Sequence, residues 1–302
     1  MGWDFRRQLA LFGPGHAPAS PAQAARYCRW AAHAHYENFS VASLLLPRRL
    51  LRHFHAVYAY CRWADDLGDE TGERAPELLS WWRGELERMH AGEATHPVFV
   101  ALRATVERYR IPPDPFRDLL SAFEQDQRVK RYATHEELLG YCARSANPVG
   151  RLVLHLWECH GPRTEELSDH VCTGLQEANF WQDVARDFAI GRVYLPQEDM
   201  DRFGVTEEDI AARRATPAFR ELMRFQVGRT RARLEAGRPL VDLVPPAVRA
   251  EMGLFLAGGL GILSAIERAG YDVLSSRPAL SKWEKGKLVL AALWWKLAGG
   301  TP

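Results

Sequence analysis

Apolar residues recur along most of the chain with the period of an amphipathic α-helix. In the clearest run they stand at i, i+4, i+7, i+8 and i+11, at Leu50, Phe54, Val57, Tyr58 and Cys61. Residues 217–238 form a second run of this kind. Alternation of Val, Ile or Thr with polar residues is nearly absent, and neither Asn-Gly nor Asp-Gly occurs. The pattern predicts an all-α protein, a single-domain bundle of about ten helices.

The breaks between these runs predict one domain with a loose start. Pro and Gly cluster between positions 13 and 21, whereas the later breaks are short and separate long helical stretches. No repeat of fixed period and no linker between segments of different composition is present. We therefore expect a flexible N-terminal lead over residues 1–24 and one all-helical domain over residues 25–302.

Composition narrows the class of protein. The 302 residues include 39 basic and 38 acidic side chains, and a net charge of +1 argues against a nucleic-acid-binding protein. With 47% hydrophobic residues, the chain can build a core. The five cysteines never form Cys-x-x-Cys, so they indicate neither a disulfide framework nor a zinc site. Free thiols of this kind favour a reducing cytoplasm.

Two segments bear on membrane contact. The longest uncharged stretch, 252–266, has 15 residues, whereas a spanning helix needs about 20, so we expect no transmembrane segment. The apolar tail 288–295 is flanked by four lysines, Lys282, Lys285, Lys287 and Lys296. A last core helix with one solvated face is the favoured interpretation. Contact of this tail with a membrane surface is the alternative.

Two acidic clusters carry the candidate chemistry. In the first, Asp65 and Asp69 stand one helical turn apart, and Arg62 lies a turn before Asp65. In the second, the spacing i, i+4, i+8 places three oxygen-bearing side chains on one helix face, those of Asn179, Asp183 and Asp187. Both clusters are embedded in apolar sequence, which is unusual for a merely solvated helix face.

Carboxylates one turn apart repel each other, so such a helix needs a compensating positive charge. Mg²⁺ suits this role, because it prefers oxygen ligands and binds through one or two carboxylates plus substrate phosphate. Each cluster by itself is more often a solvated face. Their joint occurrence, more than a hundred residues apart, favours two facing helices that hold several Mg²⁺ ions around a diphosphate.

Five blocks follow one another in the chain, and together they resemble a known family. The blocks are Tyr58-x-x-x-Arg62-x-x-Asp65-Asp66-x-x-Asp69, Tyr141-Cys-Ala-Arg-Ser-Ala-Asn-Pro-Val149-Gly150, Gln176-x-x-Asn179-x-x-x-Asp183-x-x-x-Asp187, Gly191-Arg192-Val-Tyr194-Leu-Pro196, and Gly270-Tyr-Asp-Val-Leu274 followed by Arg277. The chain resembles the squalene/phytoene synthases, all-α head-to-head prenyl synthases, over about residues 27–297. The resemblance implies an isoprenoid-synthase-type helical bundle with a central pocket.

The resemblance also implies roles for individual residues. The implied Mg²⁺-diphosphate ligands are Asp65, Asp69, Asn179, Asp183 and Asp187. Three side chains match positions near the diphosphate, those of Arg62, Arg192 and Tyr194. Tyr58 and Gln176 match pocket positions, and Gly150 is assigned with them to the substrate site.

Departures from the family pattern narrow the reaction. Tyr36-Glu37-Asn38-Phe39 replaces the usual Ser-x-Ser-Phe, Gln182 replaces a common Arg, and Gly259 stands where many relatives have Tyr. The Glu-Asn-Phe and Trp-Gln-Asp signatures resemble the hydroxysqualene synthase branch of hopanoid biosynthesis. Gln182 either weakens binding of a second diphosphate or faces solvent. The glycines of 258–261 either widen the pocket or permit tight helix packing.

We therefore hypothesise that presqualene diphosphate and water become hydroxysqualene and diphosphate. Phe39, Tyr58 and Tyr194 are candidates for stabilising the cation, and Asn38 or Glu37 either positions the water or packs. One alternative is a squalene or phytoene synthase that condenses two prenyl diphosphates. Another is a non-catalytic scaffold protein. We expect several Mg²⁺ ions, no NADPH, a cytoplasmic location that leaves peripheral contact with the inner membrane face open, and other enzymes of the squalene pathway as partners.

Overall fold

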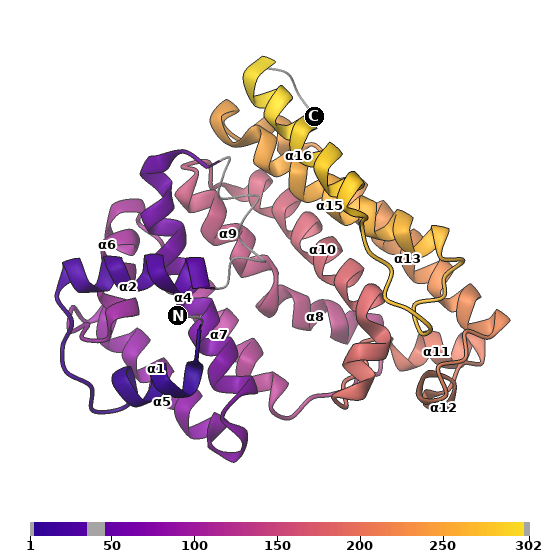
Figure 1. Cartoon of the computed structure of the whole chain (residues 1–302), viewed down its shortest axis with the longest axis horizontal. Helices are drawn as coiled ribbons and strands as arrows, with labels where there is room; N and C mark the ends of the chain where they lie inside the picture. Colours follow the sequence, from indigo (N-terminus) through magenta and orange to yellow (C-terminus); the bar gives the residue numbers. More distant parts are fainter. Residues whose placement is uncertain (1–2, 35–45, 299–302) are drawn as a thin grey trace. The chain divides into compact units, whose positions relative to one another are not determined.

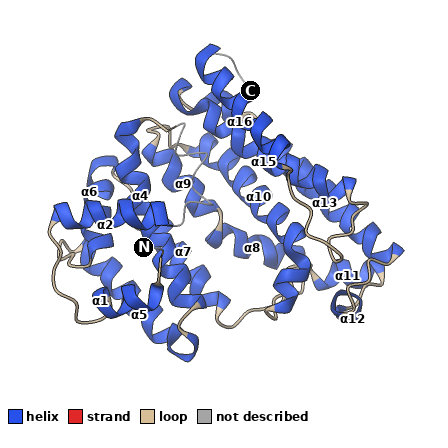
Figure 2. Ribbon diagram, viewed as in Figure 1, coloured by secondary structure: helices blue, strands red, loops and turns tan. Residues whose placement is uncertain are grey.

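The protein is helical throughout the part of the chain that the structure describes. This computed structural model describes residues 3–34 and 46–298, and no strand occurs among them (Figure 1; Figure 2). The all-α prediction is therefore confirmed. The helices outnumber the roughly ten expected from the periodicity, because short helices fill connections that read as breaks in the sequence.

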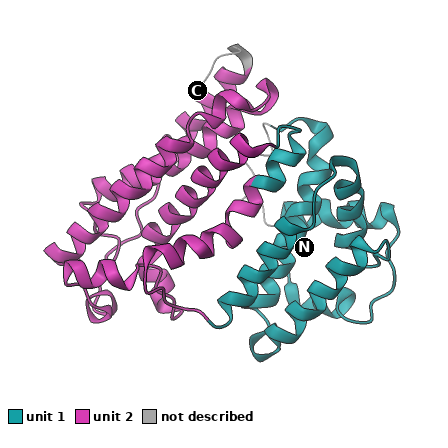
Figure 3. Cartoon of the chain, turned by 180° about the vertical axis from the view of Figure 1, so that it is seen from behind, with its two compact units in different colours: residues 1–128, 151–160 teal, residues 129–150, 161–302 magenta. Residues whose placement is uncertain are grey.

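The chain divides into two compact units (Figure 3). One comprises residues 1–128 and 151–160, and the other comprises residues 129–150 and 161–302. One of the three boundaries, between residues 150 and 151, falls within α9 (Asn147–Leu156). Each unit contains one of the two acidic clusters, so each cluster is described with the helix that carries it.

The first unit is built around α4, which carries the first acidic cluster. Its helices are α1 (Phe5–Phe12), α2 (Pro21–Ala34), α4 (Arg48–Asp69), α5 (Ala75–His90), α6 (Pro97–Tyr109) and α7 (Asp114–Asp126). Trp63 of α4 is fully buried, and its ring stacks on that of Trp82 at 5.2 Å with 7° between the planes. The Tyr60 hydroxyl donates to the Phe116 carbonyl at 2.8 Å. These contacts bury one side of α4 and leave the other side to carry its charged residues.

The N-terminal segment is helical where the sequence predicted a loose lead. Asp4 caps α1 by accepting from the Arg7 backbone N–H at 3.2 Å. Phe5 is buried with its ring edge-on to Trp63, 5.2 Å away, and the Trp3 indole donates to Asp66 at 2.7 Å. These aromatic contacts pack the segment against the first unit. No local sequence pattern predicts them.

The second unit is built around the long helix α10 (Pro162–Ala189), which lies against α13 and α15 (Figure 1). Its other helices are α8 (His135–Ser145), α11 (Gln197–Phe203), α12 (Glu207–Ala211), α13 (Pro217–Gly237), α14 (Leu240–Leu243), α15 (Arg249–Arg268) and α16 (Lys282–Ala298). A Cβ on Gly174 would lie 2.7 Å from the Leu234 side chain, so glycine lets α10 and α13 approach closely.

A buried polar network fixes the rotation of α10 against its neighbours. The Trp181 indole is fully buried and donates to Thr230 at 2.7 Å. Glu177, also fully buried, accepts from His135 at 2.7 Å and from Arg233 at 3.2 Å. Burial raises the pKa of Glu177, but the His135 hydrogen bond and the Arg233 charge outweigh it and hold that pKa below its ordinary value. The network aims the opposite face of α10, with Asn179 and Asp183, away from this core.

The segment Pro246–Arg268, which includes α15, is long and apolar enough by composition to cross a membrane. Half of its most apolar window is buried inside the protein. It also carries Glu251, which is fully buried and pairs with Lys296 at 3.2 Å. This burial is typical of the core helix of a globular protein.

Buried histidines of the first unit predict that the protein loses stability in mild acid. Burial, together with nearby positive charges, lowers the pKa of His53 and of His55 to about 4, and burial holds the pKa of His96 well below its ordinary value. In the unfolded chain these histidines become protonated near pH 6.5, whereas in the folded protein His53 and His55 become protonated only near pH 4. The free energy of unfolding should therefore fall between pH 6.5 and 4, by about 1–2 kcal/mol per histidine from pH 7 to pH 5.

Urea unfolding at pH 7 and pH 5 checks this prediction. His53→Gln should reduce the difference between the two pH values by about 1–2 kcal/mol. The exposed His160 offers a matched control, and His160→Gln should leave the difference unchanged. Equal pH dependence in all three proteins would refute the assignment.

Candidate active site

The first cluster lies on the last two turns of α4 and is organised by Arg62. The Arg62 guanidinium donates to Asp65 at 3.1 Å and to Asp66 through both Nε, at 3.1 Å, and Nη2. Asp66 is buried, Asp65 is part-exposed and Asp69 is exposed. Arg62 is therefore held by Asp66 along the helix that also presents Asp65 and Asp69.

Asp66 is a residue whose role the sequence pattern did not reveal. Burial raises the pKa of its carboxyl to about 7, while Arg62 and the Trp3 hydrogen bond act against that rise. Asp66 is 1% exposed, and Arg62 and Trp3 satisfy its carboxylate oxygens. Asp66 orients Arg62. The apolar neighbours of Asp66 in the sequence were the signal that could have predicted its burial.

Tyr58 lies one turn before Arg62 on α4 and is half-buried. Burial raises the pKa of its hydroxyl, which stays protonated near neutral pH. Asn38 and Phe39, like Tyr36 and Glu37, lie outside the residues that the structure describes. Their predicted roles therefore stay predictions.

The second cluster lies along one face of α10, as the spacing predicted. Asn179 is exposed, Asp183 is 9% exposed and Asp187 is half-buried. Burial, and then the negative charge of Asp183, raise the pKa of Asp187 to about 7. Positive charges from Arg192, Arg186 and Arg277 act against this rise without cancelling it. The pair thus holds negative charge that the protein alone leaves incompletely compensated.

Arg277 joins this cluster from the loop that precedes α16. Its guanidinium grips Asp183 with two hydrogen bonds, from Nε at 2.6 Å and from Nη2 at 2.7 Å. The same Nη2 donates to the side-chain oxygen of Gln182 at 2.8 Å. A two-pronged pair of this kind is among the stronger charge-assisted contacts in proteins. The sequence suggested Arg277 as part of a family block, but not as the partner of Asp183.

Gln182 is 5% exposed, so the solvent-facing interpretation of this residue is wrong. Its amide nitrogen donates to the Pro278 carbonyl at 2.6 Å, and its oxygen accepts from Arg277. Gln182 therefore anchors the loop that brings Arg277 to Asp183. Gln182 replaces an Arg that is common in the family and so carries no charge, but Arg277 supplies a positive charge beside Asp183.

An apolar pocket of about 270 Å³ opens beside Asn179 and Gln182. Its wall comes from α10 and α15, through Leu175, Ala178, Leu254, Phe255, Gly258, Gly259 and Ile262. Nothing lies within 4 Å of a Cβ built on Gly258, whereas a Cβ on Gly259 would lie 2.7 Å from Leu175. Both interpretations of the glycine cluster therefore hold, with Gly258 leaving space in the pocket and Gly259 permitting close packing.

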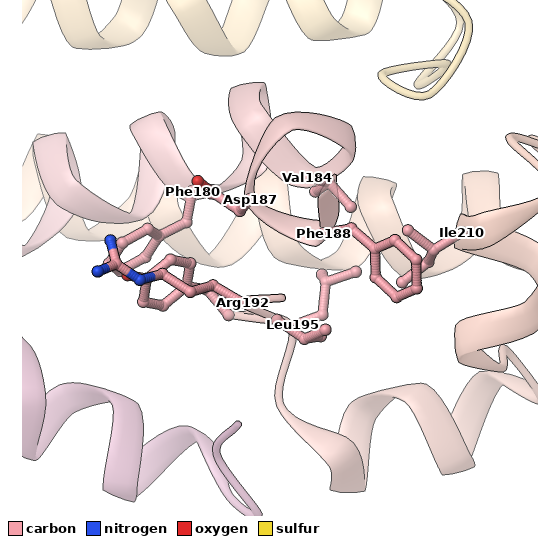
Figure 4. Close-up of a pocket in the computed structure, with 9 residues that line it drawn as sticks. Phe180, Val184, Asp187, Phe188, Arg192, Leu195 and Ile210 are labelled. Atoms are coloured by element: carbon pink, nitrogen blue, oxygen red, sulfur yellow. The ribbon is translucent and has the colours of Figure 1, made fainter. Parts of the chain in front are cut away.

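The connection after α10 places Arg192 and Tyr194 near Asp187. These residues line a cavity of about 10 Å³, room for about one water molecule, together with Phe180, Val184 and Ile210 of the same unit (Figure 4). Tyr194 is 9% exposed, and its ring stacks on Phe180 at 3.9 Å with 11° between the planes. One face of the Tyr194 ring is thus covered by an aromatic neighbour.

Two further predicted residues lie on α9 and α10. A Cβ on Gly150 would lie 2.3 Å from the Ser168 hydroxyl and 2.6 Å from the Cys172 sulfur. Glycine at this position lets α9 approach α10. Gln176 is half-buried on α10, one turn before Asn179.

The donors on α10 fit a divalent ion of the magnesium type. Mg²⁺ prefers oxygen and needs only one or two carboxylates, because water and phosphate complete its coordination. Asp183 and Asp187 supply such a pair, and Asn179 adds an amide oxygen one turn away. Within residues 3–34 and 46–298, no three His, Cys, Asp or Glu side chains are gathered tightly enough to hold an ion by themselves. The carboxylate pair fits an ion whose other ligands are water and substrate phosphate.

Comparison with known proteins places these features in a family. The squalene/phytoene synthase family model matches residues 32–284. The chain is 37% identical to the hydroxysqualene synthase of Rhodopseudomonas palustris over 68% of this chain and 70% of that protein. It is 30% identical to the phytoene synthase of Arthrospira platensis over 89% of this chain and 92% of that protein. The crystal structure of squalene synthase HpnC from Alicyclobacillus acidocaldarius superposes with a TM-score of 0.81 and 46% identity, over 83% of this chain and 96% of that one.

Proposed function

Because the chain belongs to the squalene/phytoene synthase family, we propose that it converts presqualene diphosphate and water into hydroxysqualene and diphosphate. The family consists of enzymes of isoprenoid biosynthesis that process prenyl diphosphates. Two hydroxysqualene synthases are 37% and 33% identical to this chain, and the Gln182 departure supports that branch.

One observation carries the proposal. The oxygen-bearing face of α10 borders an apolar pocket of about 270 Å³: Asn179 belongs to both, and Gln182, the neighbour of Asp183, also lines the pocket. A prenyl diphosphate has the same two parts, an anionic head and a hydrocarbon chain. Sites of this kind combine an apolar lining with a few placed polar groups.

In the proposed reaction, the carbon–oxygen bond to diphosphate breaks and its electron pair leaves with the diphosphate. The residues proposed to hold Mg²⁺ are Asp65, Asp69, Asn179, Asp183 and Asp187, and a bound ion would neutralise the charge of the leaving group. Arg62 and Arg192 add charge-assisted hydrogen bonds to the departing oxygens.

The remaining cyclopropylcarbinyl cation rearranges to an allylic cation in the apolar pocket. The aromatic rings of Tyr58, Phe39 and Tyr194 are the groups proposed to stabilise positive charge, by about 0.5–2 kcal/mol each. One water then forms the new carbon–oxygen bond and loses a proton, with Asn38 or Glu37 as the positioning group. The apolar lining of the pocket keeps other water away from the earlier cation. Capture of that cation by water would give a different alcohol.

A single-turnover incubation with presqualene diphosphate and Mg²⁺, without NADPH, tests the proposal. Hydroxysqualene is the expected product. Recovery of unchanged substrate would contradict the assignment, and so would squalene formed only when NADPH is added.

A second candidate is a full synthase that condenses two prenyl diphosphates. It is favoured by the phytoene synthase of Arthrospira platensis, which matches 89% of this chain, whereas the hydroxysqualene synthase of Rhodopseudomonas palustris matches 68%. Product from farnesyl or geranylgeranyl diphosphate alone would support it. A scaffold protein without activity is disfavoured, since all five carboxylates Asp65, Asp66, Asp69, Asp183 and Asp187 are present. Absence of stabilisation by Mg²⁺ and diphosphate together would favour that scaffold.

The proposal places the protein in the cytoplasm, in peripheral contact with the membrane in which the long isoprenoid chains of its substrate and product dissolve. Other enzymes of the squalene pathway are its proposed partners, since one of them must supply presqualene diphosphate and another must consume the alcohol.

A further inference from the structure

The last helix, α16, packs on α15 with one side and exposes an apolar stripe on the other. Ala292 is fully buried and marks the inner side. Trp283, Leu290 and Trp294 are 71%, 65% and 65% exposed, and their spacing of i, i+7 and i+11 puts them on one face. Leu293 borders the stripe at 41% exposed. The predicted core contact therefore holds for the inner side, but the outer side is apolar where a solvated face was expected.

Lysine is concentrated in this helix. Four of the five lysines of the chain belong to it, although arginine supplies 34 of the 39 basic residues overall. Lys282, Lys285 and Lys287 are exposed, and the Lys287 ammonium lies 5.2 Å from the centre of the Trp283 ring. Lysine has a long apolar stem, so it can keep its charge in a polar layer while the stem covers apolar surface.

The acidic residue of the helix does not cancel this charge. Glu284 accepts from the backbone N–H and hydroxyl of Ser281, both at 2.8 Å, and pairs with Arg268 at 2.7 Å. Lys296 is paired inward with buried Glu251.

Lys285 stands seven residues before Ala292 and so lies on the other side of the helix from the stripe. Lys287, in contrast, lies beside the stripe, and Lys282 lies at its edge. The outer surface of α16 thus combines two tryptophans and two leucines with two exposed lysines.

We propose that this surface docks on an anionic phospholipid bilayer. Tryptophan favours the boundary between headgroups and acyl chains, and leucine gains by leaving water for that boundary. The lysines complement the negative headgroups, each contributing about tenfold or less to affinity. The inference rests on the proposed function only in one respect: the long isoprenoid chains of the proposed substrate and product partition into the membrane on which the protein would dock.

A second copy of the chain is a weaker occupant of the stripe. Stable dimers bury about 800 Å² on each partner. Two part-exposed tryptophans and two leucines offer on the order of 500 Å² of apolar area. Lysines on both copies would also repel each other across a two-fold contact.

Vesicle flotation with the whole protein tests the proposal. The wild type should bind vesicles of equal parts phosphatidylglycerol and phosphatidylcholine at least about tenfold more tightly than pure phosphatidylcholine vesicles. The double variant Leu290→Glu/Trp294→Glu should lose about tenfold or more of this binding. Leu11 is 56% exposed on α1, and Leu11→Glu is the matched control that should bind like the wild type. Replacing Lys282 and Lys287 with Gln should remove the preference for anionic vesicles.

The outcomes separate this proposal from the proposed function. Absence of wild-type binding, or equal loss in Leu11→Glu, would overturn the docking surface. A concentration-dependent dimer that Leu290→Glu disrupts, without vesicle binding, would overturn it in favour of a second copy. Turnover of presqualene diphosphate in detergent should be the same in the wild type and in the α16 variants. A wild type that floats with vesicles but produces no hydroxysqualene would refute the function and leave the docking surface standing.

Discussion

Asp183→Asn is expected to lower the turnover of presqualene diphosphate about a thousandfold. The substitution removes one negative charge from the α10 face at the position where Asp183 and Asp187 would share a metal ion. Stabilisation of a leaving group by a metal amounts to several kcal/mol, and about 4 kcal/mol corresponds to that change in rate. Single-turnover rates at saturating Mg²⁺ measure the effect.

The same substitution also loosens the ion pair with Arg277, so stability has to be measured alongside activity. Asp183 accepts two hydrogen bonds from Arg277, and the loss of its charge leaves that part-buried guanidinium weakly paired. The exposed Asp201 is a suitable control, and Asp201→Asn should keep wild-type turnover. A folded Asp183→Asn protein with turnover within tenfold of the wild type would remove Asp183 from the proposed metal site.

Gln182→Arg is expected to reduce the free energy of unfolding by about 2–4 kcal/mol. Position 182 is buried and already receives a hydrogen bond from Arg277, so a second guanidinium would face a like charge. Arginine has no acceptor, so the hydrogen bond that the Gln182 side-chain oxygen accepts from Arg277 would also be lost. Because Arg277 already supplies the positive charge beside Asp183, the variant should not gain condensation of farnesyl diphosphate.

A double-mutant cycle makes this prediction specific. Adding Arg277→Gln to Gln182→Arg should recover about 1–3 kcal/mol relative to the sum of the single effects, since it removes the repulsion. Gln197 is exposed, and Gln197→Arg should change stability by no more than about 0.5 kcal/mol. Additive single effects, or squalene-type product from farnesyl diphosphate in the variant, would contradict the role of Gln182 as the anchor of Arg277.

The α10 cluster shows how far local spacing predicts a site. A separation of four residues places side chains on one face of any α-helix, so Asn179, Asp183 and Asp187 were predicted together and do lie together along α10. Local spacing could not predict Arg277, which lies 94 residues beyond Asp183 and reaches it only through the packing of the loop before α16. Gln182 looked open to solvent for the same reason.

The first cluster has the same limit. Asp65, Asp66 and Asp69 are alike in composition, but only Asp66 is turned into the core, where Arg62 and Trp3 satisfy it. The N-terminal segment is helical and Phe5 packs against Trp63 in the core. The many prolines and glycines nearby gave no sign of this contact in the sequence.

By itself, the amino-acid sequence determined the all-α class, the family and the two acidic faces, because each depends on residue order within a few helical turns. Only the tertiary structure decided which carboxylates are buried, which guanidinium grips Asp183, and which glycine of 258–261 opens the pocket. It also decided that Trp283, Leu290 and Trp294 face outward rather than into the core. These properties depend on which residues pack against each side chain, and tertiary packing brings those residues from distant parts of the chain.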